Sequence, residues 1–414
     1  MMLEKIGESA KAAKGLLEQL TTEEKNKGLD MVAKGLLMDT DIILKANEKD
    51  MDNGQKKGMS QGLLDRLKLT KDRIRAMAEG IRQVMDLPDP VGEILEELRR
   101  PNGLVLQKKR VPMGVIGIIY EARPNVTADA FALCFKTGNA VILKGGSDAI
   151  HSNIAITESI RKALKQAGIT PDAISLIEAT DRATTSRFMK MNQYIDVLIP
   201  RGGAGLIQSV VNNSTIPVIE TGTGNCHIYV DKDADLNMAL EIIINAKTQR
   251  IGVCNACESL VIHEKIIDDF LPMLNKAMKE AGVEIRGDEA VCRLVEDSKP
   301  ASAEDYAAEY LDYILSARTV ESLEQAIEHI NHYHTMHSDC IITENIQAAE
   351  TFLNRVDSAC VYWNASTRFT DGFEFGFGAE IGISTQKLHA RGPMGLKELT
   401  SYKYLIRGTG QIRP

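Results

Sequence analysis

Residues 114–144 read GVIGIIYEARPNVTADAFALCFKTGNAVILK. The apolar run Gly114–Tyr120 predicts a buried strand, Thr127–Thr137 has the spacing of a helix, and Ala140–Lys144 predicts a second buried strand. These three elements form a βαβ unit, in which the crossover helix makes the two strands parallel. The stretch therefore indicates a parallel sheet that is covered by helices.

The alternation of strands and helices continues outward from this unit. Before it, apolar residues three or four apart predict helices from residue 1 to about residue 100, with a break at Pro88 and Pro90. The alternation at 104–110 predicts a hairpin that leads into the first strand. After it, we expect a helix at 153–167, strands at 174–177 and 195–200, a helix from 204 and a strand at 216–220.

A second α/β block is expected after residue 226. Its expected strands lie at 227–230, 260–263, 340–343 and 359–363, and its expected helices at 236–246, 266–281, 320–330 and 346–353. The last residues are rich in Gly and then alternate at 402–406. This alternation predicts an edge strand that could pair with a partner subunit.

Composition and charge narrow the class of protein. With 414 residues, 44% of them hydrophobic and 26% charged, the chain is long enough for two or three globular domains. A formal net charge of -8 without a long basic run argues against a nucleic-acid or anionic-membrane surface, so a small metabolite is the expected partner. No stretch approaches the ~18 apolar residues of a membrane span, and residues 1–20 lack a signal-peptide core. Seven scattered cysteines favour a reducing cytoplasm over a disulfide framework.

The segment 245–258, NAKTQRIGVCNACE, carries a candidate nucleophile. Cys254 lies near Lys247 and Arg250, and cationic neighbours or a helix N-terminus make a thiol reactive. The alternative is that Cys254 is a small packing residue at the start of a helix. Cys254 and Cys257 also form a CxxC pair, but the context of a thioredoxin-like or zinc site is missing. The spacing places both sulfurs on one helical face, which leaves open a regulatory disulfide that masks Cys254.

Four histidines have a spacing that resembles that of metal ligands: His329, His332, His334 and His337. No Cys or Glu completes a familiar metal pattern, so we predict no metal. A structural or substrate-pocket role is favoured for this tract, and a metal site stays the alternative.

Two glycine-rich turns follow predicted strands: Lys144-Gly145-Gly146-Ser147 and Pro200-Arg201-Gly202-Gly203-Ala204-Gly205. Backbone N–H groups at a junction of strand, turn and helix can bind phosphate, and Lys144 adds a charge that suits an adenosine 2′-phosphate. Together the turns suggest a dinucleotide, although neither is a GxGxxG fingerprint. Each taken singly could equally be a tight turn.

The runs 112–125, PMGVIGIIYEARPN, and 138–144, GNAVILK, resemble the cofactor-domain core of the aldehyde dehydrogenases. Glu220-Thr-Gly-Thr-Gly resembles the segment that carries the glutamate of that superfamily, and Cys254 follows Glu220 by 34 residues, close to the separation expected there. The resemblance implies that Cys254, rather than Cys257, is the nucleophile.

Within the superfamily the chain is most similar to the γ-glutamyl phosphate reductases. The residues that carry this likeness are IYEARPN at 119–125, IPRGG at 199–203, AIEHINHYHTMHSDCI at 326–341, and the block 364–396 with FGFGAEIGIS and HARGPMGL. Ile251-Gly252 and Cys257 depart from the residues that are usual in this family, which puts only local details in doubt.

This resemblance implies an α/β, aldehyde dehydrogenase-like fold. Two parallel-sheet domains would enclose a cleft, and a small β element would serve oligomerisation. We predict an NADPH-binding domain at 1–222, with a hairpin at 103–113 directed toward the oligomerisation element. A catalytic domain is predicted at 223–370, and a return segment with an oligomerisation tail at 371–414.

The resemblance also implies a reaction. L-Glutamyl 5-phosphate would be reduced by NADPH to L-glutamate 5-semialdehyde and phosphate through a thioester on Cys254, which is the second step of proline biosynthesis from glutamate. The amide of Asn125 is the candidate oxyanion donor. Glu220 would orient the cofactor or assist proton transfer.

The implied binding residues form two groups. The cofactor group is Lys144, Gly145, Gly146, Ser147, Gly202, Gly203 and, on the nicotinamide ribose, Glu309. The substrate group is Ser366, Thr367 and Arg368 for the α-carboxylate and Arg123 for the leaving phosphate.

Two other functions stay open at this point. One is a hydrolytic aldehyde dehydrogenase that acts on a free aldehyde, and the other is a catalytically silent nucleotide-binding or scaffold protein on the same fold. A homodimer or homotetramer in the cytoplasm is expected. NAD in place of NADP and a transient contact with glutamate 5-kinase are left open.

Overall fold

The computed structural model describes residues 2–121 and 123–413. The chain folds into two compact units. The first consists of Met1–Glu220, Gly376–Gly382 and Met394–Pro414, and the second of Thr221–Phe375 and Ile383–Pro393. The functions assigned above to domains ending at residues 222 and 370 stay predictions.

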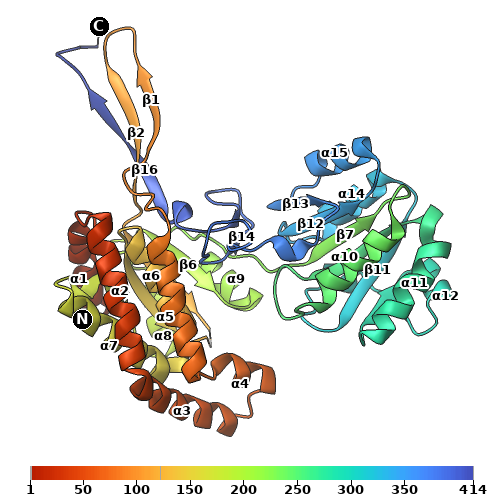
Figure 1. Cartoon of the computed structure of the whole chain (residues 1–414), viewed down its shortest axis with the longest axis horizontal. Coiled ribbons are helices and arrows are strands. Elements are labelled where there is room, and N and C mark those ends of the chain that lie inside the picture. Colours follow the sequence, from red (N-terminus) through yellow and green to blue (C-terminus); the bar gives the residue numbers. More distant parts are fainter. Residues whose placement is uncertain (1, 122, 414) are drawn as a thin grey trace. The chain divides into compact units, whose positions relative to one another are not determined.

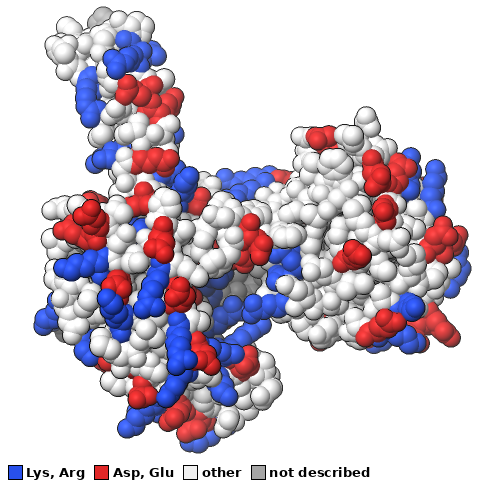
Figure 2. Space-filling model, viewed as in Figure 1, with Lys and Arg blue, Asp and Glu red and all other residues white. Residues whose placement is uncertain are grey.

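Five helices open the first unit. They are α1 (Met2–Leu17), α2 (Thr22–Met38), α3 (Thr40–Lys56), α4 (Gln61–Leu67) and α5 (Lys71–Asp86). Thr21 and Glu24 form a reciprocal capping box at the start of α2, which satisfies backbone N–H groups that a helix leaves unpaired. The apolar faces of these helices are buried, whereas acidic and basic side chains are interspersed over their outer surface (Figure 2).

A four-stranded parallel sheet forms the centre of the first unit. Its order is β5-β4-β3-β6, from β3 (Val115–Tyr120), β4 (Ala140–Gly145), β5 (Ile174–Leu176) and β6 (Val197–Arg201). The connecting elements are α6 (Asn125–Lys136), η1 (Ser147–Ala149), α7 (Ile150–Gln166), η2 (Pro171–Ala173), α8 (Arg182–Phe188) and α9 (Ala204–Asn213). Strands β3 and β4 are parallel and α6 connects them, so the predicted βαβ unit is confirmed. Every residue of both strands is buried. The strand predicted at 216–220 is wrong, because this segment takes part only in an isolated bridge between Val218 and Leu198.

A three-stranded antiparallel sheet extends from the rest of the first unit (Figure 1). It contains β1 (Ile94–Arg99), β2 (Val105–Pro112) and β16 (Thr400–Arg407), and η5 (Lys397–Leu399) precedes β16. The helical prediction up to about residue 100 is therefore wrong at its end. Helix α5 stops before Pro88 and Pro90, and the pairing of β1 with β2 overrides the helical spacing beyond them. The predicted edge strand is confirmed, and it pairs with β2 of the same chain.

The second unit is built on a seven-stranded parallel sheet of order β10-β9-β11-β8-β7-β12-β13. The strands are β7 (Cys226–Val230), β8 (Cys257–His263), β9 (Glu284–Gly287), β10 (Lys299–Pro300), β11 (Ile314–Val320), β12 (Ser338–Ile342) and β13 (Cys360–Trp363). The helices are α10 (Leu236–Thr248), η3 (Glu264–Ile266), α11 (Ile267–Glu280), α12 (Glu289–Leu294), α13 (Ala303–Ala307), α14 (Leu323–Tyr333), α15 (Ile346–Arg355) and η4 (Thr367–Phe369). Strands β14 (Ile383–Ser384) and β15 (Gly392–Pro393) form a separate antiparallel pair. The elements from β9 to β11 were not expected from the sequence. Strands β9 and β10 are too short for a clear period.

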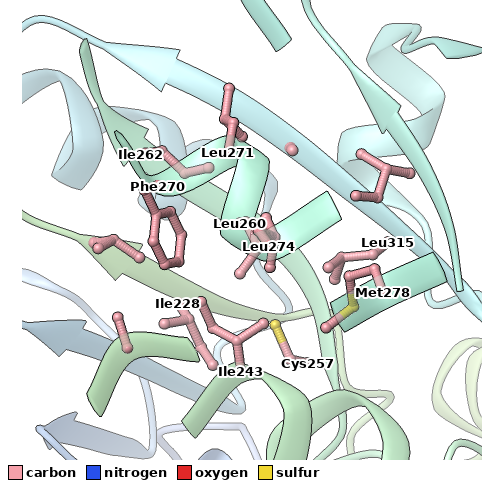
Figure 3. Close-up of a cluster of buried hydrophobic side chains, with 14 of the residues drawn as sticks. Ile228, Ile243, Cys257, Leu260, Ile262, Phe270, Leu271, Leu274, Met278 and Leu315 are labelled. Atoms are coloured by element: carbon pink, nitrogen blue, oxygen red, sulfur yellow. The ribbon is translucent and has the colours of Figure 1, made fainter. Parts of the chain in front are cut away.

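Alternate residues of the central strands face two different cores. One core contains Ile228 and Leu260 and packs against α11, as Figure 3 shows. The other contains Tyr229 and Val261 and packs against α14 and α15. Since successive side chains of a strand point to opposite faces, helices cover both faces of this sheet. Among the helices that the structure describes, none is long and apolar enough to cross a membrane.

Candidate active site

Cys254 lies in the loop 249–256, which connects α10 to β8. It is partly exposed, whereas Cys257 is the first residue of β8 and is fully buried. Figure 3 shows the Cys257 sulfur among apolar side chains, and burial raises the pKa of this thiol. The prediction that both sulfurs share a helical face is wrong, because the segment is a loop followed by a strand. Cys257 packs in the core, and Cys254 is the accessible thiol of the pair.

The segment that leads into β7 holds the backbone of Cys254. A Cβ atom on Gly224 would lie 1.4 Å from the Cys254 carbonyl oxygen, so this close approach requires glycine. The Cys226 thiol donates to the same oxygen, with 3.1 Å from Sγ to O. The Gly224 N–H donates to Glu309 Oε1 at 2.7 Å, and burial raises the pKa of the Glu309 carboxyl. Glu309, predicted to bind the nicotinamide ribose, thus anchors Gly224, and its role at the ribose stays a prediction.

A buried ion pair joins the two ends of the loop. Lys247 lies in the last turn of α10 and Glu258 near the start of β8, with 2.5 Å between Nζ and Oε2 and neither side chain exposed. Glu258 Oε1 also accepts a hydrogen bond from the Leu311 N–H at 3.1 Å. Burial raises the pKa of Glu258 to about 7, against the opposing effect of Lys247. Lys247, expected to act as a cation beside Cys254, is therefore paired with Glu258 instead.

The predicted substrate segment 366–368 is bonded to the same loop. Thr367 Oγ1 donates to the Asn255 carbonyl oxygen at 2.8 Å, and Asn255 Nδ2 donates to the Arg368 carbonyl oxygen at 3.3 Å. Ser366 Oγ accepts from the Arg368 N–H at 3.3 Å, as the N-cap of η4. The Thr367 hydroxyl and the Asn255 amide therefore hold the two loops together, while the Ser366 hydroxyl caps η4 within its own segment.

The guanidinium of Arg368 lies against the start of the nucleophile loop. Its Nε donates to Gln249 Oε1 at 2.8 Å. Burial lowers the pKa of Arg368, and the charge of Arg250 lowers it further, while Asp371 and, after it, Cys254 oppose both. Two guanidinium groups and the Cys254 thiol therefore interact electrostatically in one region, which suits an anionic substrate.

Two histidines of the tract, His334 and His337, form hydrogen bonds within the second unit. His227 Nδ1 lies 3.2 Å from Asp339 Oδ1, and His334 Nδ1 lies 2.9 Å from Asp339 Oδ2. Burial lowers the pKa of His329 to about 3 and that of His337 to about 4, so both rings are neutral at neutral pH. Within residues 2–121 and 123–413, no group of three or more His, Cys, Asp or Glu could hold a metal ion. His334 and His337 are accounted for by hydrogen bonds within the fold, whereas the His329 ring contacts the rings of Tyr306 and Tyr333 and has no hydrogen-bond partner among the described residues.

The first predicted glycine turn follows β4 in the first unit. A Cβ atom on Gly145 would lie 2.4 Å from Asn153 Nδ2, which is buried without a hydrogen-bond partner among the described residues. Lys144 Nζ donates to the Gly145 carbonyl oxygen at 3.0 Å, and burial lowers the pKa of Lys144. Gly146 is the N-cap of η1, which begins at Ser147.

The second predicted turn, at Gly202 and Gly203, leads from β6 into α9 and holds a carboxylate. The Gly203 N–H donates to Glu121 Oε2 at 2.9 Å, and a Cβ atom on Gly202 would lie 2.5 Å from the same oxygen. Helix N-termini favour negative charge, so the Glu121 carboxylate stands where a phosphate oxygen could bind. The unpartnered Asn153 amide, this helix terminus and two glycines at which a Cβ would meet the Asn153 and Glu121 side chains fit the phosphates of a dinucleotide.

The remaining predicted residues also lie in the first unit. Asn125 is the exposed first residue of α6, and its Nδ2 donates to Asp129 Oδ2 at 2.9 Å. Burial raises the pKa of Asp129 to about 6. Arg123 is exposed just before α6, and Glu220 is partly buried after the bridge at Val218.

Sequence reasoning missed the residues that hold the nucleophile loop in place: Gly224, Cys226, Gln249, Asn255 and Glu258. Of these, Glu258 had a signal in the sequence. It precedes the apolar run of β8 and follows Lys247 by 11 residues, and a carboxylate beside a buried strand requires a cationic partner.

Comparison with known proteins identifies the family. Residues 2–310 match the model of the aldehyde dehydrogenase family. The γ-glutamyl phosphate reductase of Lachnospira eligens is 61% identical over 411 residues, which are 99% of each chain. The solved γ-glutamyl phosphate reductase of Thermotoga maritima is 47% identical, with a TM-score of 0.98 over 100% of both chains. An engineered glycolyl-CoA reductase with bound NADP+ shares the fold at 15% identity, with a TM-score of 0.68 over 97% of this chain and 96% of its own.

These likenesses confirm the predicted fold class and the resemblance found in the sequence. Membership of the family implies an oxidoreductase that uses a nicotinamide cofactor. The chain belongs to the aldehyde dehydrogenase family, and within it to the γ-glutamyl phosphate reductases.

Proposed function

We propose that this protein reduces L-glutamyl 5-phosphate with NADPH to L-glutamate 5-semialdehyde and phosphate, the second step of proline biosynthesis from glutamate. One observation carries the proposal. A partly exposed cysteine, Cys254, stands in a loop whose backbone is held by Gly224 on one side and by Thr367 on the other. The relatives that bear the name of this activity match the chain over nearly its whole length.

In the first half of the reaction, Cys254 acts as a thiolate nucleophile. Its sulfur attacks the γ-carbonyl carbon, the bond from that carbon to the phosphate oxygen breaks, and phosphate leaves with the electron pair to give a thioester. The fixed backbone favours this step because the nucleophile must approach the carbonyl in one geometry. The Cys254 N–H and the Asn125 amide are the proposed oxyanion donors. Asn125 must first turn away from Asp129.

In the second half, the thioester is reduced. When bound, NADPH supplies the hydride for this step. The residues proposed to hold it are Lys144, Gly145, Gly146, Ser147, Gly202, Gly203 and, at the ribose, Glu309. Hydrolysis would waste the thioester, so Glu220 is assigned to orienting the cofactor or assisting proton transfer. Collapse of the thiohemiacetal then frees the aldehyde and returns the Cys254 thiolate.

Arg368 is the proposed partner of the substrate's α-carboxylate, and Arg123 that of the leaving phosphate. Ser366 and Thr367 contribute to this subsite by fixing the segment that carries Arg368. Loss of a charge-assisted bond in Arg368→Ala is expected to raise KM for the semialdehyde about tenfold or more. Arg355→Ala, which removes an exposed arginine of the same unit, is the matched control. An unchanged KM in Arg368→Ala would exclude the α-carboxylate role.

We also propose a homodimer or homotetramer that forms through the sheet β1-β2-β16. This sheet exposes large apolar side chains, namely Ile94, Leu95, Leu98, Tyr402, Tyr404 and Ile406. Such a patch marks an interaction surface, and sedimentation of an Ile94→Glu/Ile406→Glu variant tests it.

Seven cysteines without disulfides favour the cytoplasm as the location. Transient contact with glutamate 5-kinase stays a prediction.

The reverse reaction tests the proposed function. Glutamate 5-semialdehyde and NADP+ are supplied with and without inorganic phosphate to the wild type and to Cys254→Ala. We expect NADPH formation that depends on phosphate and is lost in the variant. Oxidation without phosphate would indicate a hydrolytic dehydrogenase, and no activity in the wild type would contradict the proposal.

A further inference from the structure

We propose that the buried Lys247–Glu258 ion pair positions Cys254 for attack, and that both residues act through the nucleophile loop without touching the substrate. This inference rests on the proposed function, in which Cys254 is the nucleophile. It assigns a role in the reaction to two fully buried charged side chains that the mechanism above does not use.

The pair closes the nucleophile loop at its base. Lys247 is the penultimate residue of α10, and Glu258 is the second residue of β8, so the loop 249–256 lies between them. A bond across the base of a loop removes conformations from the loop, and this bond is inaccessible to water. The position of Cys254 relative to β8 is therefore restricted by the pair.

A second path leads from the pair to the backbone of Cys254. Glu258 Oε1 accepts from the Leu311 N–H, and Leu311 has a φ of 54°, a left-handed conformation that bulky side chains rarely adopt. Two residues earlier, Glu309 holds the Gly224 N–H. Gly224 in turn abuts the Cys254 carbonyl. Glu258 thus fixes the segment that carries Glu309, and Glu309 holds the glycine that abuts the nucleophile.

Stability alone does not explain the charges. Replacing a buried ion pair by apolar residues of similar volume is often neutral or stabilising, and the core around Cys257 next to Glu258 is apolar. Apolar side chains would fill this space but would provide neither a directional bond across the loop nor an acceptor for Leu311. The geometry therefore points to positioning as the function of the pair.

The experiment compares wild type with the double variant Lys247→Met/Glu258→Gln, which leaves no unpaired charge in the core. Each protein is treated with iodoacetamide, and alkylation of the Cys254 peptide is followed by mass spectrometry. Because misplacement of a reacting group lowers rates by one to two orders of magnitude, we expect alkylation and kcat both to fall about tenfold or more, with KM unchanged. Lys279→Met, which breaks the exposed Lys279–Asp297 pair, should change neither rate.

A folded double variant with wild-type alkylation and kcat would overturn the inference. Should this variant fail to fold, Glu258→Asp replaces it, since aspartate keeps the charge but has a shorter reach. The same two rates then decide, with slowing as the expected result and wild-type rates as the contrary one. Wild-type turnover that survives complete alkylation of Cys254 would instead refute the proposed function, which separates the two failures.

Discussion

The glycine turns of the first unit and the nucleophile loop of the second differ in what holds them. The backbone at Gly202 and Gly203 is exposed to solvent, and the Gly203 N–H donates to the exposed Glu121 side chain. The loop 249–256 is instead tied by a buried ion pair and by the segment 366–368. A ligand that must come and go requires backbone donors that can open, whereas covalent chemistry requires one fixed geometry. The following changes test whether this difference in rigidity is real.

Gly224→Ala should have the largest effect, because it acts on the fixed region. The added Cβ would overlap the backbone of Cys254, so the loop itself must move. We expect kcat to fall about a hundredfold and alkylation of Cys254 to slow.

The matched control for this change is Gly15→Ala in α1. A Cβ at Gly15 meets no atom within 4 Å, so turnover should stay at the wild-type rate. Full activity in Gly224→Ala would show that the nucleophile loop tolerates displacement, and the contrast between the regions would be lost.

The pH dependence of stability should reveal the buried carboxyl of the fixed region. Burial raises the pKa of Glu258 from 4.5 to about 7, while Lys247 opposes the shift and Glu309 adds to it. Compared with the unfolded state, the folded state therefore binds the proton of the Glu258 carboxyl more tightly. Its contribution to stability is complete below pH 4.5 and is lost as the pH rises through about 7.

Relative to Lys247→Met/Glu258→Gln, the wild type should lose about 3 kcal/mol of unfolding free energy over this range. Urea titrations at a series of pH values measure this difference. Parallel curves for the two proteins would mean that Glu258 titrates alike in the folded and unfolded states.

Gly145→Ala probes the open region. The added Cβ would meet the end of the Asn153 side chain, which can rotate away, so the backbone can stay in place. We expect NADP+ to bind about tenfold more weakly because the displaced amide and the methyl group alter the turn, with alkylation of Cys254 unaffected. Gly80→Ala in α5 adds a Cβ in open space and serves as the control. Slower alkylation in Gly145→Ala would contradict the separation of roles.

Glu121→Gln should have the smallest effect. It neutralises the carboxylate at the N-terminus of α9, which competes with an anionic ligand for the Gly203 N–H. Removing this competition should tighten NADP+ binding about threefold, as measured by fluorescence titration at low salt. Weaker binding would mean that Glu121 assists the cofactor instead.

The two regions also differ in how well the sequence predicts them. The turns follow from local pattern, because an apolar run such as Gly114–Tyr120 and the glycines after β4 and β6 mark strand ends directly. The contacts that hold the backbone of Cys254 do not follow from local pattern. Glu309 meets Gly224 across 85 residues, and the approach of Gly224 to Cys254 depends on sheet order. Likewise 94–99 has helical spacing, yet pairing with β2 makes it a strand.

The sheet β1-β2-β16 has a consequence for synthesis of the chain. Arg407 of β16 bonds to Gln107 of β2 across 300 residues. A ribosome adds about 5–20 residues per second, so the edge of β2 that pairs with β16 stays unpaired for roughly 15–60 s. An unpaired edge of this kind invites nascent chains to aggregate. Because charged side chains disfavour pairing at an edge, we expect Lys108 and Lys109 of β2 to reduce pairing with other copies until β16 is made.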